Sequence, residues 1–148
     1  MNQFGKMKLL AIAATLGVLM LPAGSKAEDR EHHREHCSNA TLHGGYGLHA
    51  TGITAGGGNF AAVGRFNFDG KGNLTGALFV RVDGGNGELS ITGIYSVSSD
   101  CIVDDTWNYS GGSSTHKSII VKEGKEYFIL NDSSDDGMSV ISGEAKKQ

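Results

Sequence analysis

Apolar and polar residues alternate with a period of two through most of the chain after residue 40. Because successive side chains of a β-strand point to opposite faces, this period predicts strands that each have one apolar face. Clusters of Gly, Asn and Asp separate the alternating stretches, as is typical of tight turns. No helical period of useful length appears. We predict eight strands, at about residues 41–53, 59–68, 74–82, 89–97, 101–109, 115–122, 125–131 and 137–146.

Eight short strands joined by short turns predict an all-β fold, a single antiparallel up-and-down barrel, because closure pairs the edges that an open sheet would expose. A two-sheet β-sandwich is the alternative. The glycines within the predicted strands favour the barrel, since bends at barrel corners use glycine. An eight-stranded barrel has an interior just wide enough to be filled by side chains or to hold one small ligand.

The first 27 residues have the pattern of a signal peptide. Lys6 and Lys8 precede an apolar run of about thirteen residues, and the small-residue site Ser-Lys-Ala ends at residue 27. Such a run is too short to span a bilayer as a helix. We therefore predict a signal peptide at residues 1–27, a flexible arm rich in His and acidic residues at 28–36, and a β-barrel domain at 37–148. The expected location is secreted or periplasmic, without a transmembrane segment after cleavage.

Charge and cysteine content narrow the possible partners. Three of the 13 Lys and Arg residues but none of the 16 Asp and Glu residues fall within the signal segment, so the remaining chain is net acidic. A net acidic domain without a basic stripe predicts no nucleic-acid partner. Cys37 and Cys101 both remain after cleavage, and an oxidising compartment favours a disulfide between them. Two buried free thiols are the alternative.

Several short motifs carry a resemblance to known proteins. They are Cys-Ser-Asn-Ala-Thr-Leu at 37–42, Gly-Tyr-Gly at 45–47, Ala-Ala-Val-Gly at 61–64, Phe-Asp-Gly-Lys-Gly-Asn-Leu at 68–74, Gly-Ile-Tyr-Ser-Val at 93–97 and Asp-Cys at 100–101. In these motifs the chain resembles small exported bacterial proteins of largely unassigned function, which are similar to lipocalin-like and allene-oxide-cyclase-like barrels. The resemblance implies the barrel fold. It carries no catalytic residue to this sequence.

The apolar face contains polar groups of the kind that line ligand pockets. Tyr46 and Tyr95 fall among aliphatic and aromatic positions, and Asp105 alternates with Val103 and Trp107. If Asp105 points inward, burial raises its pKa and it is suited to acid–base chemistry. Alternatively the strand is flipped or bulged and Asp105 faces water. We prefer this second interpretation, because the adjacent Asp104 shows that acidic residues are tolerated there.

These features lead to three hypotheses of function. The first is a non-enzymatic binding protein for a small, mostly apolar molecule, without a cofactor. The second is a cyclase or isomerase of the allene-oxide-cyclase-like kind, in which Asp105 or a tyrosine moves a proton. The third is an envelope or interaction protein with a filled barrel. For the first, the predicted ligand-binding residues are Tyr46, Phe66, Tyr95, Asp105, Trp107 and Phe128.

Histidines offer a separate candidate for metal binding. His32, His33 and His36 lie close together in the arm, and imidazoles at this density can bind Zn, Cu or Ni. The alternative is a solvated arm without a physiological metal. His43 and His49 share the polar face of the first strand and are expected to face solvent, whereas the sequence gives no acidic partner for His116.

Overall fold

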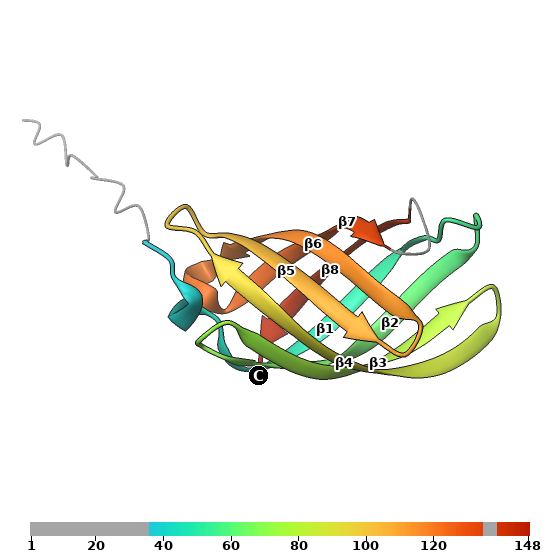
Figure 1. The fold of residues 1–148 in the computed structure, drawn as a ribbon, viewed down its shortest axis with the longest axis horizontal. Coiled ribbons are helices and arrows are strands. Elements are labelled where there is room, and N and C mark those ends of the chain that lie inside the picture. The colour runs from blue at the N-terminus through green and yellow to red at the C-terminus, as the bar shows by residue number, and fades with distance from the viewer. Residues whose placement is uncertain (1–35, 135–138) are drawn as a thin grey trace, which may run out of the picture. The chain divides into compact units, whose positions relative to one another are not determined.

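The computed structural model describes residues 36–134 and 139–148, which form an eight-stranded β-barrel (Figure 1). The predicted signal peptide and all of the predicted arm before His36 lie outside the described residues. Two short 3-10 turns, η1 (Asn39–Thr41) and η2 (Lys122–Gly124), accompany the strands. The strands are β1 (His43–Ile53), β2 (Asn59–Asp69), β3 (Asn73–Val82), β4 (Gly85–Val97), β5 (Ile102–Tyr109), β6 (Gly112–Val121), β7 (Glu126–Ser134) and β8 (Val140–Lys147).

Every strand pairs antiparallel with the next one along the chain, and β8 pairs with β1 to close the barrel. The β1–β2 register places His43 opposite Asp69, and the β1–β8 register places Tyr46 opposite Lys147. The pairing of β6 with β7 is irregular between Thr115 and His116. The predicted up-and-down barrel is thus confirmed, and the β-sandwich alternative is wrong.

Inward-facing glycines let the strands approach closely where the barrel curves. A Cβ atom on Gly64 would lie 2.1 Å from the carbonyl oxygen of Ala77, and one on Gly93 would lie 2.2 Å from that of Thr106. Real Cβ atoms do not come this close to backbone oxygen. These positions therefore require glycine because of the neighbouring strand, as expected of bends in a barrel wall.

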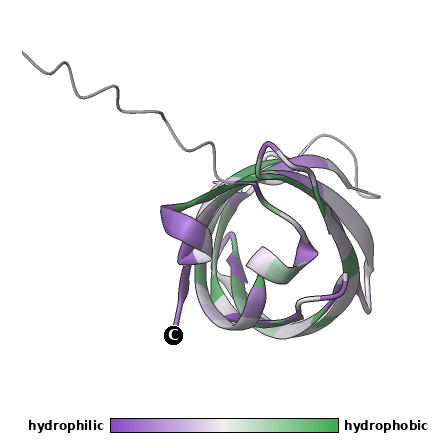
Figure 2. Cartoon of the chain, turned by 90° about the vertical axis from the view of Figure 1, so that its left-hand side faces the viewer, coloured by the Kyte–Doolittle hydropathy of each residue, from purple (hydrophilic) through white to green (hydrophobic). Residues whose placement is uncertain are grey.

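At the end of the barrel where η1 lies, large buried aromatic side chains occupy the interior; we call it the closed end. Tyr46, Phe68, Tyr95 and Tyr127 form an aromatic cluster there, with edge-to-face contacts at centroid distances of 5.0–5.6 Å. The Tyr46 hydroxyl donates to the Gly124 carbonyl (2.5 Å), and the Tyr95 hydroxyl donates to carbonyls of η1 and the residue after it. Figure 2, drawn from this side, shows a short helical turn lying across the barrel.

The predicted disulfide between Cys37 and Cys101 is confirmed, with a Cα–Cα distance of 4.9 Å. It joins the segment before η1 to the turn between β4 and β5. The Cys37 amide also donates to the Ser99 carbonyl at 3.3 Å. Since both links lie beside η1, they hold the closed end together.

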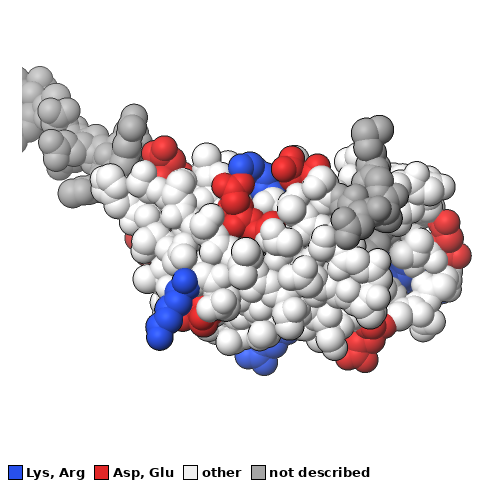
Figure 3. Space-filling view, viewed as in Figure 1, with Lys and Arg blue, Asp and Glu red and all other residues white. Residues whose placement is uncertain are grey.

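The outer surface carries scattered charges. Acidic and basic side chains are interspersed on the face shown in Figure 3, and Lys122 pairs with Glu126 at 2.8 Å. Within residues 36–134 and 139–148, no helix is long and apolar enough to cross a membrane.

Candidate functional site

A cavity of about 220 Å³ lies inside the barrel at the end opposite η1, which we call the cavity end. Thr54, Val82, Tyr109 and Ser139 lie near its mouth, where strands end or begin. The wall is mostly aliphatic. Its apolar residues include Leu48, Ala62, Leu78, Ile91, Ile129 and Ile141.

The cavity exists because inward-facing residues differ between the two halves of the barrel. At the closed end they are aromatic, whereas at the cavity end small residues such as Ala50, Ala62 and Gly143 alternate with aliphatic ones. The space exceeds the roughly 150 Å³ of an engineered apolar cavity that binds benzene. It therefore suits a compact molecule of one or two rings.

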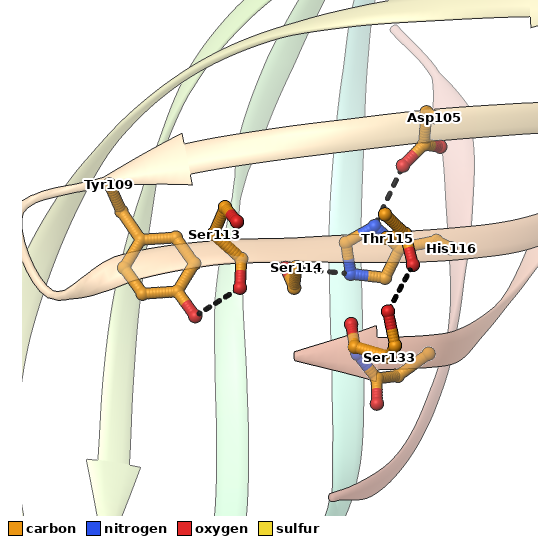
Figure 4. A network of polar contacts seen from close by, with 8 residues as sticks. Asp105, Tyr109, Ser113, Ser114, Thr115, His116 and Ser133 are labelled. Atoms are coloured by element: carbon orange, nitrogen blue, oxygen red, sulfur yellow. Dashed lines mark hydrogen bonds and ion pairs between the residues drawn. The ribbon is translucent and has the colours of Figure 1, made fainter. Parts of the chain in front are cut away.

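A chain of polar side chains forms part of this wall (Figure 4). Asp105 on β5 lies opposite His116 on β6, and their Oδ1 and Nδ1 atoms are 2.7 Å apart. The other ring nitrogen of His116, Nε2, lies 3.2 Å from the hydroxyl of Ser114. Carboxylate, imidazole and hydroxyl thus form one hydrogen-bonded series, with His116 and Ser114 lining the cavity.

Burial sets the protonation behaviour of this series. The Asp105 side chain is 1% exposed, and desolvation raises its pKa, while the hydrogen bond from His116 partly opposes the rise. When Asp105 is ionised, Nδ1–H of neutral His116 donates to its Oδ1, and Nε2 accepts from the Ser114 hydroxyl. When Asp105 is protonated, its O–H donates to Nδ1, and Nε2–H of His116 donates to the Ser114 oxygen instead.

Trp107 and Asn131 extend the polar wall on either side of His116. The Trp107 ring contacts the imidazole at a centroid distance of 4.0 Å, and Asn131 on β7 lies opposite His116, beside the register shift of β6. The buried Trp107 Nε1 and Asn131 Oδ1 atoms have no hydrogen-bond partner among the described residues. Such shifts commonly re-aim side chains next to functional sites.

The predicted ligand-binding residues occupy different levels of the barrel. Trp107 lines the cavity. Asp105 is buried and hydrogen-bonded to His116, so the preferred outward orientation of Asp105 is wrong. It points inward because it lies on the same face of β5 as Val103 and Trp107. The hydrogen bond to His116 satisfies its carboxyl group there. Phe66 is fully buried and packs against Trp107 at a centroid distance of 4.5 Å.

Like Asp105 and Phe66, the other three predicted ligand-binding residues do not line this cavity. Tyr46 and Tyr95 point inward but lie at the closed end, where their hydroxyls already bind backbone carbonyls. Phe128 is 51% exposed on the outside of the barrel, so its predicted inward orientation is wrong. The alternation of β7 buries Tyr127 and Ile129 instead, because Phe128 has the opposite parity.

The histidine predictions have mixed outcomes. His32 and His33 lie outside the described residues, and His36 is exposed. Within the described part of the chain, no group of three or more His, Cys, Asp or Glu residues is placed to hold a metal ion. Metal binding by the arm stays a prediction. His43 and His49 are exposed, as expected.

Ser114, His116 and Asn131 were missed as site residues. They have the inward parity of Ile120 on β6 and of Ile129 on β7, so counting back from these apolar residues places all three on the inner face. They were missed because inward-facing positions were identified by apolar residues, and these three residues are polar.

Comparison with known proteins shows similarity of fold. No protein family and no curated protein matches the chain. The redesigned β-barrel mFAP1, solved bound to DFHBI, has a TM-score of 0.56 at 13% identity, covering 77% of this chain and 99% of its own. A de novo designed fluorescence-activating β-barrel has a TM-score of 0.51 at 14% identity, covering 73% of this chain and 94% of its own. A further structure bound to DFHBI, EF1p2_mFAP2b, has a TM-score of 0.52 at 11% identity, covering 73% of this chain and 94% of its own. This chain thus shares the barrel fold of these designed proteins.

Proposed function

We propose that the protein binds a small, mostly apolar molecule inside its barrel. The observation that carries this proposal is the cavity of about 220 Å³, whose wall is largely aliphatic and aromatic with a few polar groups. Ligand sites usually combine an apolar lining with a small number of hydrogen-bonding side chains that fix orientation. The cavity also argues against the hypothesis of a filled barrel.

Two further observations support the proposal. Paired strands close the barrel all round the cavity, so the cavity is largely formed before a ligand arrives. Two designed barrels of similar fold were solved bound to DFHBI. The disulfide also suits a protein that acts in a secreted or periplasmic setting.

Native mass spectrometry of protein purified from its natural source tests the proposal. Ala62 lines the cavity and is 3% exposed, so Ala62→Phe should fill the space. Ala61 is exposed on the outer face of the same strand, which makes Ala61→Phe the matched control. We expect a co-purifying small molecule with the wild type and Ala61→Phe but not with Ala62→Phe. Consistently bare wild-type protein would count against the proposal.

The hydrogen-bonded series of Asp105, His116 and Ser114 favours a second candidate, an isomerase or cyclase of an apolar substrate. His116 would move a proton at the cavity wall, and Asp105 would position its ring and tautomer.

Solvent isotope exchange tests this second candidate. The recovered ligand would be incubated in D2O with wild-type protein, with His116→Gln, and with His49→Gln as a control on an exposed histidine. An enzyme should introduce deuterium or convert the ligand, and only His116→Gln should abolish the effect. If the mass and structure of the ligand do not change, the enzyme candidate is contradicted and only the binding function remains.

A further inference from the structure

The wall of the cavity contains a serine that is hydrogen-bonded to a histidine. Ser114 Oγ lies 3.2 Å from His116 Nε2, and His116 Nδ1 lies 2.7 Å from Asp105 Oδ1. Ser114 and His116 both line the cavity, whereas Asp105 does not. The series thus runs from hydroxyl through imidazole to carboxylate, which is the order that activates serine nucleophiles on several unrelated folds.

Two neighbouring strands hold this series in place (Figure 4). Ser114 and His116 are two positions apart on β6, so both side chains lie on its inner face. Asp105 lies directly opposite His116 in the β5–β6 register. A serine hydroxyl is a weak nucleophile unless a base within hydrogen-bond reach removes its proton, and His116 is such a base. Proton transfer by His116 alone gives the Ser114 oxygen no chemical role, so the series can do more than the isomerase candidate requires.

The rest of the wall determines which substrate suits this serine. Among the described residues that line the cavity, none is Asp, Glu, Lys or Arg, so a charged substrate would lack a counter-ion. A neutral ester combines an uncharged body with an electrophilic carbonyl carbon. Its acid product ionises in water, and burial of that charge without a partner is unfavourable. The wall therefore favours entry of the ester and release of the acid.

We propose that Ser114 is a catalytic nucleophile that hydrolyses a compact, neutral ester inside the cavity, with His116 as its general base. The Ser114 Oγ bonds to the carbonyl carbon while its proton passes to His116 Nε2. The ester C–O bond then breaks, and the leaving alcohol takes this proton. Water attacks the acylated serine in the same way, which releases the acid and restores the hydroxyl. This activity goes beyond binding, but it rests on the cavity that the proposed binding function uses.

Hydrolysis of p-nitrophenyl acetate, a compact neutral ester, tests the activity through the release of nitrophenolate. We expect Ser114→Ala and His116→Gln to lower the protein-dependent rate about 100-fold, because general-base assistance contributes at least this factor. Ser118→Ala is the matched control and should keep the wild-type rate, since Ser118 is buried on the same inner face of β6 but does not line the cavity. The anionic p-nitrophenyl succinate should react about tenfold more slowly than the acetate, because its charge finds no partner on the wall.

Phenylmethylsulfonyl fluoride identifies the reacting atom in the wild type without any substitution. Ser114 Oγ should displace the fluoride and keep the sulfonyl group, which peptide mass spectrometry locates. We expect the label on Ser114 in the wild type and in Ser118→Ala, and much slower labelling of Ser114 in His116→Gln.

Asp105 acts through His116 and is therefore a positioning residue. In the reacting form its carboxylate accepts from Nδ1–H, which leaves Nε2 free to take the proton of Ser114. The amide of Asp105→Asn can donate to Nδ1 and so place the ring proton on Nε2. At pH 8, nitrogen NMR should show the Nδ1–H tautomer of His116 in the wild type and the Nε2–H tautomer in this variant, with slower labelling of Ser114. An unchanged tautomer would overturn this role of Asp105.

The outcomes separate this inference from the proposed binding function, which calorimetry with naphthalene tests in the same samples. Folded wild-type protein that gains no sulfonyl group on Ser114, and hydrolyses the ester no faster than Ser114→Ala, would overturn the inference. Binding of naphthalene by that protein would still support an apolar site. Equal labelling of Ser114 in the wild type and His116→Gln would overturn the role of the base. If Ser114 is labelled but naphthalene does not bind, the inference is supported and the binding of a mostly apolar molecule is contradicted.

Discussion

At the scale of single residues, Asp105 is the clearest case of a side chain whose charge is set by the fold. Burial raises its pKa above the ordinary value of 3.8, so the folded protein holds this proton at pH values where the unfolded chain has lost it. The stability that this proton contributes is full below about pH 3.8 and is lost as the pH rises toward the folded pKa.

Asp105→Asn should remove this pH dependence. Relative to the wild type, the variant should become more stable as the pH rises above about 4, seen as a larger free energy of unfolding in urea denaturation at several pH values. Asp100→Asn, in the exposed turn between β4 and β5, is the control. Wild-type and Asp105→Asn curves that stay parallel across this range would show that the carboxyl group does not titrate as described.

The pKa of Asp69, at the turn between β2 and β3, is shifted in the opposite direction to that of Asp105. Its carboxylate accepts hydrogen bonds from the Asn73 side chain and from the backbone amides of Asn73, Lys71 and Gly72, which lower its pKa to about 2. Its stabilising contribution is present above about pH 4 and disappears as the pH falls toward 2.

Asp69→Ala should therefore lower the thermal midpoint at pH 6, and the difference from wild type should shrink between about pH 4 and pH 2. Thermal scans over this range measure the effect, with Asp100→Ala in the exposed β4–β5 turn as control. A difference that is constant with pH would indicate that the turn depends on the shape of Asp69 and not on its charge.

At the scale of strands, close approach across the barrel wall explains where glycine is required. Gly93→Ala places a Cβ atom 2.2 Å from the Thr106 carbonyl oxygen, on the neighbouring strand. Overpacking of this kind typically costs about 1–3 kcal/mol in free energy of unfolding. Gly56→Ala is the matched control because nothing lies within 4 Å of its added Cβ. Equal stability of the two variants in chemical denaturation would contradict the close approach.

The strand scale is also where sequence reasoning succeeded most fully. Period-two alternation and Gly-rich turns placed all eight strands and most of their inner faces, because one side chain in two must face the barrel interior. Alternation became ambiguous in β7, where Tyr127, Phe128, Ile129 and Leu130 are all apolar. Parity alone could not say that Phe128 would point outward.

The candidate site was harder to predict, because it depends on pairing between strands. The position of Tyr46 and Tyr95 along the barrel axis follows from the register of eight strands, which alternation does not report. The pairing of Asp105 with His116 likewise follows from the β5–β6 register. The sequence could therefore name Trp107 as a candidate ligand-binding residue but not the acidic partner of His116.

At the scale of the whole molecule, the two ends of the barrel differ in structure. The closed end holds the aromatic cluster, η1 and the disulfide, and the cavity end holds the candidate site. The disulfide closes a loop with a sequence separation of 64 residues. Replacing both Cys37 and Cys101 by Ser should lower the free energy of unfolding by about 4 kcal/mol under the chain-entropy account, measured by urea denaturation. An unchanged free energy would show that the bond does not stabilise the fold.

This division predicts that stability and binding can be changed separately. Since the disulfide lies beside η1 and does not line the cavity, the double Cys→Ser variant should bind naphthalene, a compact apolar probe, within about twofold of the wild type. Calorimetry should be done where both proteins are fully folded. Both proteins should also gain the same free energy of unfolding at saturating probe, because that gain depends only on probe concentration and affinity. Loss of affinity in a variant that remains folded would mean that the closed end shapes the cavity, and that the barrel responds as one unit from end to end.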